Sequence, residues 1–378
     1  MNSLTSKELN SLNPADMLIL DVRNSTSFSY GHIPGAINVK LDEIEKVIEQ
    51  NKAKNKVLIY CNNGEKSAKI IKNLRKTGQK VQFLRGGYLS YIQNNIELGI
   101  KNNLNADVEL SLRKKFHKSL FSKFCQALNE YELIKPHDKI AVCISGGKDS
   151  FLMAKLFQEL KRHNKFDFDL VYLVMDPGYS PENRKIIELN AKLLEIPVKI
   201  VNSSIFANVA NIEKSPCYIC ARMRRGTLYS EAKKLGCNKI ALGHHFDDVI
   251  ETILLGMLYG AQIQTMMPKI KSTNFKGMEL IRPMYLLREA DIKHWRDYNG
   301  LHFLQCACKF TEEVAEENSN SANLSSKRAK VKKLIAQLAK EDPQIAQNIF
   351  RSVENVNLST IIEYKDKANQ THNFKDEY

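Results

Sequence analysis

The sequence predicts an α/β protein with two successive parallel-sheet domains followed by C-terminal helices. Short apolar segments, such as Lys56–Cys61, Lys139–Ile144 and Phe168–Asp176, are typical of strands covered on both faces. Glycine-rich or polar turns follow these segments, and helical patterns follow the turns. The chain has 378 residues, which is long enough for two or three domains. We therefore expect a doubly wound parallel sheet in the second domain and a smaller α/β domain before it.

The composition favours a cytoplasmic protein with a polyanionic partner. Lys and Arg number 56 against 42 Asp and Glu, a formal net charge of +14, which places nucleic acid first among partners. There is no signal-peptide pattern and no run of 18 uncharged apolar residues, so we expect no membrane association. Eight cysteines in such a chain indicate thiol, metal or catalytic chemistry rather than disulfides. The sequence leaves the oligomeric state open, with a homodimer as one option.

The first domain is predicted to span residues 1–104. Strands are expected over Met17–Arg23, Lys56–Cys61 and 81–84, with a helix from Ala68 to Thr77. Cys61 ends the second strand, and a short loop then opens the helix. Converging N–H groups and the positive helix end would stabilise an anionic sulfur at Cys61, and Lys66 adds positive charge. The alternative is a buried structural cysteine.

Four short motifs in this region resemble the rhodanese family. They are Asp21-Val-Arg23, Gly31-His-Ile-Pro-Gly35, Cys61-x-x-Gly64-x-Lys66-Ser67 and Arg85-Gly86-Gly87, in family order. The resemblance implies a rhodanese-like sulfurtransferase domain in which Cys61 carries a persulfide, loaded by a cysteine desulfurase or another persulfide donor. The family often has Arg where this chain has Lys66, which lacks the planar fork that clamps oxyanions. That departure weakens the case for thiosulfate as the direct donor.

The segment after residue 101 is predicted to connect the domains. Asn102–Asp107 is rich in Asn and lacks periodicity, which predicts a linker. Leu110–Leu133 has apolar residues at helical spacing, which predicts one amphipathic helix. Its basic residues would face either solvent or RNA. Cys125 and Cys143 lie outside any ligand spacing and are predicted to be packing residues.

The second domain, residues 105–310, contains a candidate phosphate loop. The strand Lys139–Ile144 runs into a glycine turn and a helix, where unpaired N–H groups and the helix dipole form an anion site. The common phosphate loop G-x-x-x-x-G-K-S/T does not fit, because Val142 replaces its first Gly and Asp149 its Ser/Thr. The alternative is an ordinary αβ turn. The six residues 145–150, Ser-Gly-Gly-Lys-Asp-Ser, match the pyrophosphate loop of ATP pyrophosphatases. This match predicts that ATP is bound by Ser145, Gly146, Gly147, Lys148, Asp149 and Ser150.

A second polar turn is expected beside this loop. The strand that begins at Lys239 leads through Gly243-His-His245 into a helix from about Phe246 to Leu258. Two adjacent carboxylates at its start, Asp247 and Asp248, would bind Mg²⁺ or position a nucleotide; the alternative is an N-cap pair with solvated charges. We assign Asp149 and Asp247 to catalysis. Met175, Gly243 and Asp248 complete the predicted ATP site, with Met175 at a strand end where a base or ribose would bind.

The remaining motifs combine thiols with arginines. Cys217-x-x-Cys220 is followed near the end of the domain by Cys306-Ala-Cys308. Three thiolates with one open position would suit an iron–sulfur cluster that binds exogenous sulfur, whereas four could close a tetrahedral zinc site. The arginines that directly follow the first pair would suit RNA phosphates, or would simply be surface residues. They are Arg222, Arg224 and Arg225.

These motifs together resemble the TtcA family of tRNA 2-thiocytidine synthetases, over residues 115–355. The Ser145–Ser150 loop, Cys217-x-x-Cys220-Ala-Arg, Leu242-Gly-His-His-x-Asp-Asp248 and Ile281-Arg-Pro283 occur in family order. The resemblance implies ATP, Mg²⁺ and a 4Fe–4S cluster as cofactors, and tRNA as partner. We take Cys217, Cys220 and Cys306 as the cluster ligands, although the family often has C-x-x-C at the last site.

The expected reaction follows from the resemblance. A tRNA cytidine, by family precedent at position 32, would be adenylated at its C2 oxygen and then receive sulfur relayed from Cys61. A tRNA 2-thiouridine synthetase of the same superfamily and a zinc-bound RNA-binding or sulfur-carrier protein remain as alternatives. Residues 311–363 are predicted to form a helical extension and 364–378 a polar tail. The basic helix Lys327–Lys340 would grip tRNA or pack with a solvated face.

Overall fold

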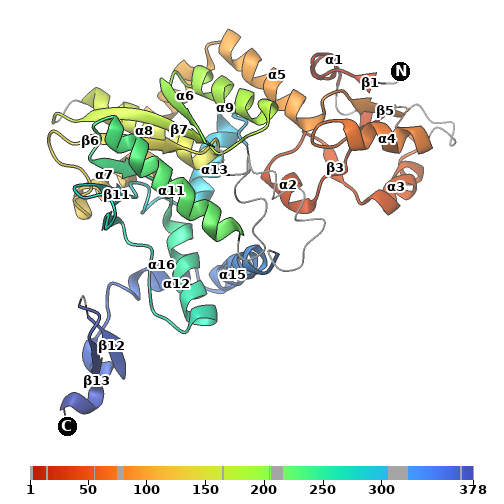
Figure 1. The fold of residues 1–378 in the computed structure, drawn as a ribbon. Helices are drawn as coiled ribbons and strands as arrows, with labels where there is room; N and C mark the ends of the chain where they lie inside the picture. Colours follow the sequence, from red (N-terminus) through yellow and green to blue (C-terminus); the bar gives the residue numbers. More distant parts are fainter. Residues whose placement is uncertain are drawn as a thin grey trace.

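The structure, a computed structural model, describes residues 3–13, 16–54, 56–74, 81–163, 166–203, 205, 216–304, 322–366 and 368–377. Two mainly parallel sheets with flanking helices form its body, which confirms the predicted α/β class (Figure 1). Within these residues, no helix combines the length and apolarity needed to cross a membrane. The predicted domain limits at residues 104, 310 and 363 stay predictions.

The N-terminal sheet is parallel throughout the described strands, in the order β1-β5-β4-β2-β3. β4 lies in its centre, so Cys61 emerges at the middle of the carboxyl edge. The helix predicted from Ala68 begins earlier, at Glu65. The elements are β1 (Ser3–Leu4), α1 (Ser6–Asn10), β2 (Met17–Asp21), α2 (Ser25–Tyr30), β3 (Ala36–Asn38), η2 (Leu41–Glu43), α3 (Ile44–Gln50), β4 (Lys56–Tyr60), α4 (Glu65–Leu74), β5 (Val81–Leu84) and α5 (Gly87–Lys101).

The connection between the sheets is helical, so the predicted linker over Asn102–Asp107 is wrong. Only Asn102 and Asn103 separate α5 from α6 (Leu104–Arg113), and Asn103 turns the chain with a φ of 53°. The reason is tertiary, because Val108 and Leu112 of α6 are buried in the core. The single helix predicted over Leu110–Leu133 is also interrupted, by the π-helical segment η4 (His117–Phe121) before α7 (Ser122–Glu130).

The second sheet has the order β10-β11-β9-β6-β7-β8, and only β10 is antiparallel to its neighbour. Residues of β6 alternate between a core with α8 and α9 on one face and a core with α11 on the other. β6 lies between β7 and β9, which makes its carboxyl end the topological switch point where α/β sheets bind ligands. The elements are β6 (Lys139–Ile144), α8 (Lys148–His163), β7 (Asp169–Asp176), α9 (Pro181–Leu193), β8 (Val198–Asn202), α11 (Pro216–Lys234), β9 (Lys239–Ala241), α12 (Phe246–Gly260), β10 (Lys269–Lys271), β11 (Glu279–Ile281) and α13 (Glu289–Tyr298).

One hydrophobic core runs through both sheet domains. Ile92 and Ile96 of α5 belong to the same buried cluster as Leu193 of α9, and the two helices pack together (Figure 1). Gly99 permits this approach, because a Cβ there would lie 3.1 Å from Leu193 Cδ1. Packing, rather than a flexible tether, therefore sets the position of the N-terminal domain.

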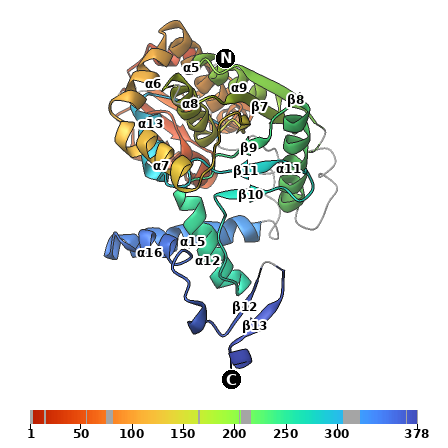
Figure 2. The ribbon, with the colours of Figure 1, turned by 90° about the vertical axis from the view of Figure 1, so that its left-hand side faces the viewer.

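The C-terminal helices pack on α12 below the second sheet (Figure 2). The basic helix predicted over Lys327–Lys340 lies within α15, and its residues Val331 and Ile335 are buried with Phe350 of α16. The predicted polar tail contains a β12–β13 hairpin that projects away from the body (Figure 1). The elements are α15 (Ala322–Glu341), α16 (Ile345–Arg351), η5 (Leu358–Thr360), β12 (Glu363–Lys365), β13 (Thr371–Asn373) and η6 (Phe374–Glu377).

Candidate active site

A cysteine loop, residues 61–67, wraps the sulfur of Cys61 directly after the central strand β4. Cys61 is buried, and the main-chain N–H of Ser67 donates a hydrogen bond to its Sγ at 3.4 Å. The Ser67 hydroxyl lies 3.5 Å from the same sulfur. Both groups lie in the first turn of α4, whose N-terminus carries partial positive charge. The loop can therefore stabilise an anionic thiolate or persulfide.

The turn between β5 and α5 stabilises the cysteine loop through main-chain hydrogen bonds. The N–H of Tyr88 donates to the carbonyl oxygen of Cys61 at 2.9 Å, and Leu89 does the same to Asn62 at 3.0 Å. Gly87 has a φ of 58°, and a Cβ there would lie 2.5 Å from both carbonyl oxygens. Only glycine fits this position without moving the cysteine loop.

The predicted phosphate loop joins β6 to α8 as a tight cradle. The N–H of Ser145 donates to Ser150 Oγ at 3.2 Å, which closes the loop on itself. Gly146 has a φ of 92°, and a Cβ there would lie 2.8 Å from Ile187 Cγ1, so this residue too must be glycine. α8 begins at Lys148 and runs for 16 residues, so its N-terminus faces the loop. The geometry is that of an anion site.

The polar turn after β9 packs directly on this loop. A Cβ on Gly243 would lie 3.3 Å from the main-chain nitrogen of Ser150. His245 Nε2 lies 3.8 Å from Asp149 Oδ1 and 3.6 Å from Asp248 Oδ2. The two stretches singled out in the sequence therefore share one crevice at the switch point between β6 and β9.

Several buried polar atoms of this crevice lack a hydrogen-bond partner in the described part of the chain. They include Asp149 Oδ1, His244 Nδ1 and Arg282 Nε. Burial lowers the pKa of His244 to about 4 and that of Arg282 to about 10. Unpaired buried polar atoms are costly, so their concentration here fits a polar ligand such as a phosphorylated nucleotide.

The two adjacent aspartates are engaged by protein groups. Asp247 Oδ2 accepts from the N–H of Glu289 at 2.7 Å, and Asp248 Oδ2 accepts from the N–H of His245 at 3.0 Å. Burial raises the pKa of Asp248, but His245 and Arg328 outweigh it and lower that pKa overall. Across the described ranges, no cluster of three metal-ligating side chains forms. Magnesium binding by Asp149, Asp247 and Asp248 stays a prediction.

An ion-pair network connects the phosphate loop with α15. Lys148 Nζ lies 3.0 Å from Asp149 Oδ2 and 3.5 Å from Glu289 Oε1. Lys332 of α15 pairs with Glu289 at 2.6 Å. Arg328 pairs with Asp248 at 2.5 Å and with Glu251 at 2.6 Å. The sequence predicted Arg328 and Lys332 only as part of a basic helix that would grip tRNA or face solvent. It did not predict these ion pairs, because only tertiary packing brings the residues together.

Met175 is the penultimate residue of β7, the strand next to β6, at the same edge of the sheet. It is buried, and Ser203 Oγ lies 3.5 Å from its Sδ. The neighbouring Asp176 accepts hydrogen bonds from the N–H groups of Gly178 and Tyr179 at 2.8 and 2.7 Å. Met175 therefore lies at the carboxyl edge, where the sequence predicted a base or ribose subsite.

The predicted cluster cysteines are only partly described. Cys217 and Cys220 lie in the first turns of α11, but their side chains, and all of Cys306 and Cys308, fall outside the described residues. Of the predicted RNA-binding arginines, Arg222 and Arg225 are exposed. Arg224 is half-buried and donates to the hydroxyl of Tyr179 at 3.3 Å.

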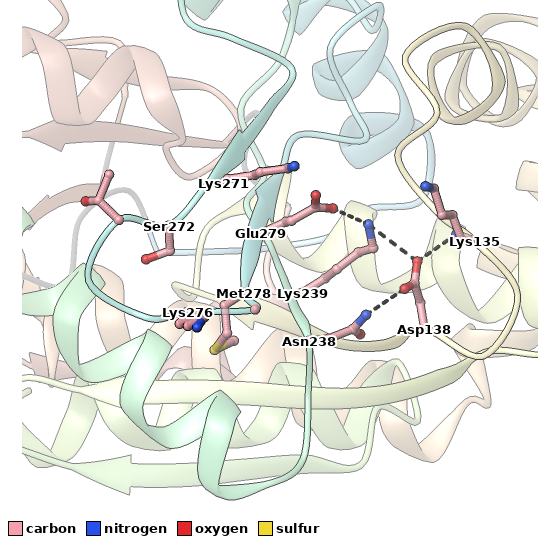
Figure 3. Close-up of a pocket in the computed structure, with 11 residues that line it drawn as sticks. Lys135, Asp138, Asn238, Lys239, Lys271, Ser272, Lys276, Met278 and Glu279 are labelled. Atoms are coloured by element: carbon pink, nitrogen blue, oxygen red, sulfur yellow. Dashed lines mark hydrogen bonds and ion pairs between the residues drawn. The ribbon is translucent and has the colours of Figure 1, made fainter. Parts of the chain in front are cut away.

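A pocket of about 640 Å³ opens at the opposite, amino edge of the second sheet (Figure 3). Lys239 crosses it, 2.6 Å from Glu279 and 3.4 Å from Asp138. Asn238 also donates to Asp138, at 2.7 Å. The buried Lys239 and Asp138 and the half-buried Glu279 pair with one another, and the phosphate loop lies at the other edge. The pocket is therefore not the nucleotide site.

Family models match most of the chain. A PP-loop domain matches residues 116–310, and a rhodanese-like domain matches residues 5–94. Among curated proteins, the chain is 33% identical over 257 residues to the tRNA-cytidine(32) 2-sulfurtransferase of Paraburkholderia phytofirmans, covering 66% of this chain and 72% of that one. It is 33% identical over 234 residues to the enzyme of that name from Syntrophotalea carbinolica, covering 61% and 86%.

Two solved structures are similar to parts of this chain. The U34-tRNA thiolase NcsA of Methanococcus maripaludis, solved with its 4Fe–4S cluster, has 21% identity and a TM-score of 0.49, covering 65% of this chain and 80% of that one. A rhodanese-related protein of Thermoplasma volcanium has 24% identity and a TM-score of 0.23, covering 25% and 93%.

Proposed function

Because this chain belongs to the PP-loop family of the tRNA-cytidine(32) 2-sulfurtransferases, we propose that it replaces the C2 oxygen of a tRNA cytidine, at position 32, with sulfur. The observation that carries the proposal is the pairing of two sites in one folded unit. One is a loop that cradles phosphate at the switch point of a parallel sheet, and the other is a cysteine loop built for anionic sulfur. Activation and sulfur supply are the two needs of a sulfur-for-oxygen exchange.

The PP-loop supplies the activation. The loop N–H groups and the N-terminus of α8 would bind the pyrophosphate part of ATP. The C2 oxygen of cytidine then attacks the α-phosphate and releases pyrophosphate, which converts a poor leaving group into a good one. Lys148 is buried at the start of α8 and would offset charge on the phosphates. Asp149 Oδ1 accepts no hydrogen bond from the described residues, so it is the carboxylate oxygen best suited to a Mg²⁺–ATP complex.

The cysteines supply the sulfur. Cys61 would accept the outer sulfur of a desulfurase persulfide and deliver it to the site formed by Cys217, Cys220 and Cys306. A 4Fe–4S cluster on these three thiolates would offer an open coordination position for the incoming sulfur. Two electrons from an external thiol reductant would bring the persulfide's outer sulfur to the sulfide level, and attack of that sulfur on C2 would expel the adenylated oxygen as AMP. Arg222, Arg224 and Arg225 follow Cys217 and Cys220 in the sequence and would bind tRNA phosphates.

Nucleoside analysis of tRNA from a deletion strain tests the reaction. We expect 2-thiocytidine to be lost and to return with the wild-type gene. Loss of 2-thiouridine with 2-thiocytidine intact would instead support the related thiouridine synthetase and refute this proposal.

Two further measurements test the sulfur route. Protein purified without oxygen should contain iron and acid-labile sulfide, whereas colourless protein with stoichiometric zinc would exclude the cluster. Cys61→Ser should lower thiolation when a desulfurase is the sole donor and preserve it with free sulfide. Undiminished thiolation with the desulfurase would mean that the rhodanese-like domain is not the route.

A further inference from the structure

Tyr30 ends α2 of the rhodanese-like domain and lies against the PP-loop of the other domain. Its hydroxyl donates a hydrogen bond to the main-chain oxygen of Leu304 at 3.0 Å. A Cβ on Gly147 would lie 3.8 Å from the same hydroxyl. The main-chain N–H of Lys148 also interacts with the phenol oxygen. The hydroxyl therefore reaches the first residue of α8, inside the predicted phosphate cradle.

Cationic groups hold this tyrosine in place. Arg296 of α13 donates from Nη1 to the carbonyl oxygen of Tyr30 at 2.9 Å, and its guanidinium carbon lies 5.8 Å from the ring centroid. Lys148 Nζ lies 5.8 Å from the same centroid. The ring of Tyr30 thus lies 5.8 Å from each of two positive side chains, and such side chains also attract phosphate. A phosphate bound at the PP-loop could therefore accept a hydrogen bond from the Tyr30 hydroxyl, which is already held in position.

The position of Tyr30 relative to the PP-loop is fixed by packing between the two domains. Its domain shares a continuous core with the PP-loop domain through Ile92, Ile96 and Leu193. Burial, followed by the charge of Asp149, raises the pKa of Tyr30 above its ordinary value. The phenol therefore keeps its proton at neutral pH and remains a hydrogen-bond donor.

We propose that Tyr30 is a nucleotide-binding residue, supplied by the rhodanese-like domain, whose hydroxyl donates a hydrogen bond to the pyrophosphate part of ATP. The inference rests on the proposed binding of ATP at the PP-loop. Binding requires only that the O–H rotate from the Leu304 carbonyl to a phosphate oxygen, while the ring stays in place. The amide of Lys148 polarises the phenol oxygen and strengthens the donated bond. The domain that carries the persulfide is thereby also part of the ATP site.

Calorimetric titration of the full chain with Mg²⁺ and α,β-methylene-ATP tests this proposal. Tyr30→Phe keeps the ring and removes only the hydroxyl, so we expect about tenfold weaker binding or more. Affinity for AMP, which lacks the pyrophosphate, should not change. Phe28→Ala is the matched control, because that ring lies on the same helix but stacks on His32 at 4.0 Å. Persulfide loading of Cys61 should be equal in all three proteins.

The outcomes distinguish a failure of the proposed Tyr30 role from a failure of the proposed nucleotide site. If wild type binds α,β-methylene-ATP and Tyr30→Phe binds it equally or more tightly, the role of Tyr30 is refuted and the proposed function stands. A parallel loss of AMP affinity would mean a general structural role and would also refute it. If wild type does not bind α,β-methylene-ATP, the proposed nucleotide site fails, and the role of Tyr30 fails with it.

Discussion

Replacing Glu289 with Gln tests whether the ion-pair network beneath the PP-loop stabilises the protein. Glu289 is 15% exposed and lies between Lys148 at 3.5 Å and Lys332 at 2.6 Å. Burial acts to raise its pKa, but the hydrogen bond from Lys332 and the charge of Lys148 outweigh burial and lower it from 4.5 to about 2. At about 1.4 kcal/mol per pKa unit, that difference corresponds to about 3 kcal/mol of stability at neutral pH.

The sign of the pH dependence follows from the direction of this change. The folded-state pKa lies below the unfolded one, so the stabilisation is complete well above pH 4.5 and is lost as the pH falls towards 2. From these two values, about 2 kcal/mol of it remains at about pH 3.5. The stability difference between wild type and Glu289→Gln should therefore shrink on acidification.

Urea unfolding followed by circular dichroism measures this difference between pH 7 and the lowest pH at which both proteins fold. Glu188→Gln is the matched control, because Glu188 is 47% exposed and pairs with Arg184 at 3.0 Å. An exposed pair of this kind contributes only about 0.5 kcal/mol. Equal losses in the two variants, or a difference for Glu289→Gln that does not shrink in acid, would refute the reasoning.

Three further predictions concern other parts of the two sites. Gly87→Ala would place a Cβ 2.5 Å from two carbonyl oxygens of the cysteine loop and should abolish persulfide loading in a gel-shift assay. Gly35→Ala is the control, because its φ of 78° is also left-handed but no atom of the described residues lies within 4 Å of its Cβ, so it should cost some stability and still load. Burial raises the pKa of Cys143 to about 12, so mass spectrometry should find it unalkylated by iodoacetamide at pH 8.5 in the native protein; rapid labelling would contradict its burial. Arg328→Ala leaves the buried Glu251 without its closest partner and should raise hydrogen exchange in α15; unchanged exchange would show that apolar packing alone holds the helix.

Local sequence was sufficient for the strands, the glycine turns and the candidate loops. The apolar run Lys139–Ile144 can satisfy its backbone and bury both faces only inside a sheet, so its place at β6 followed directly from composition. Gly146 and Gly87 adopt φ values that other residues rarely take, and their motifs predicted both turns. The same local signals failed over Asn102–Asp107, where burial of Val108 made a helix from an apparent linker.

Only the tertiary structure determined which distant residues contact the PP-loop and the polar turn beside it. Tyr30 lies far from Lys148 in the sequence, and nothing near it in the chain predicts contact with the PP-loop. Arg328 could be placed on a basic helix from sequence, but its pairing with Asp248 depends on how α15 packs against α12. Periodicity and turn chemistry act over a few residues, whereas these contacts follow from the shared core. The sequence alone determined which groups could bind phosphate and sulfur, and packing determined which other side chains surround them.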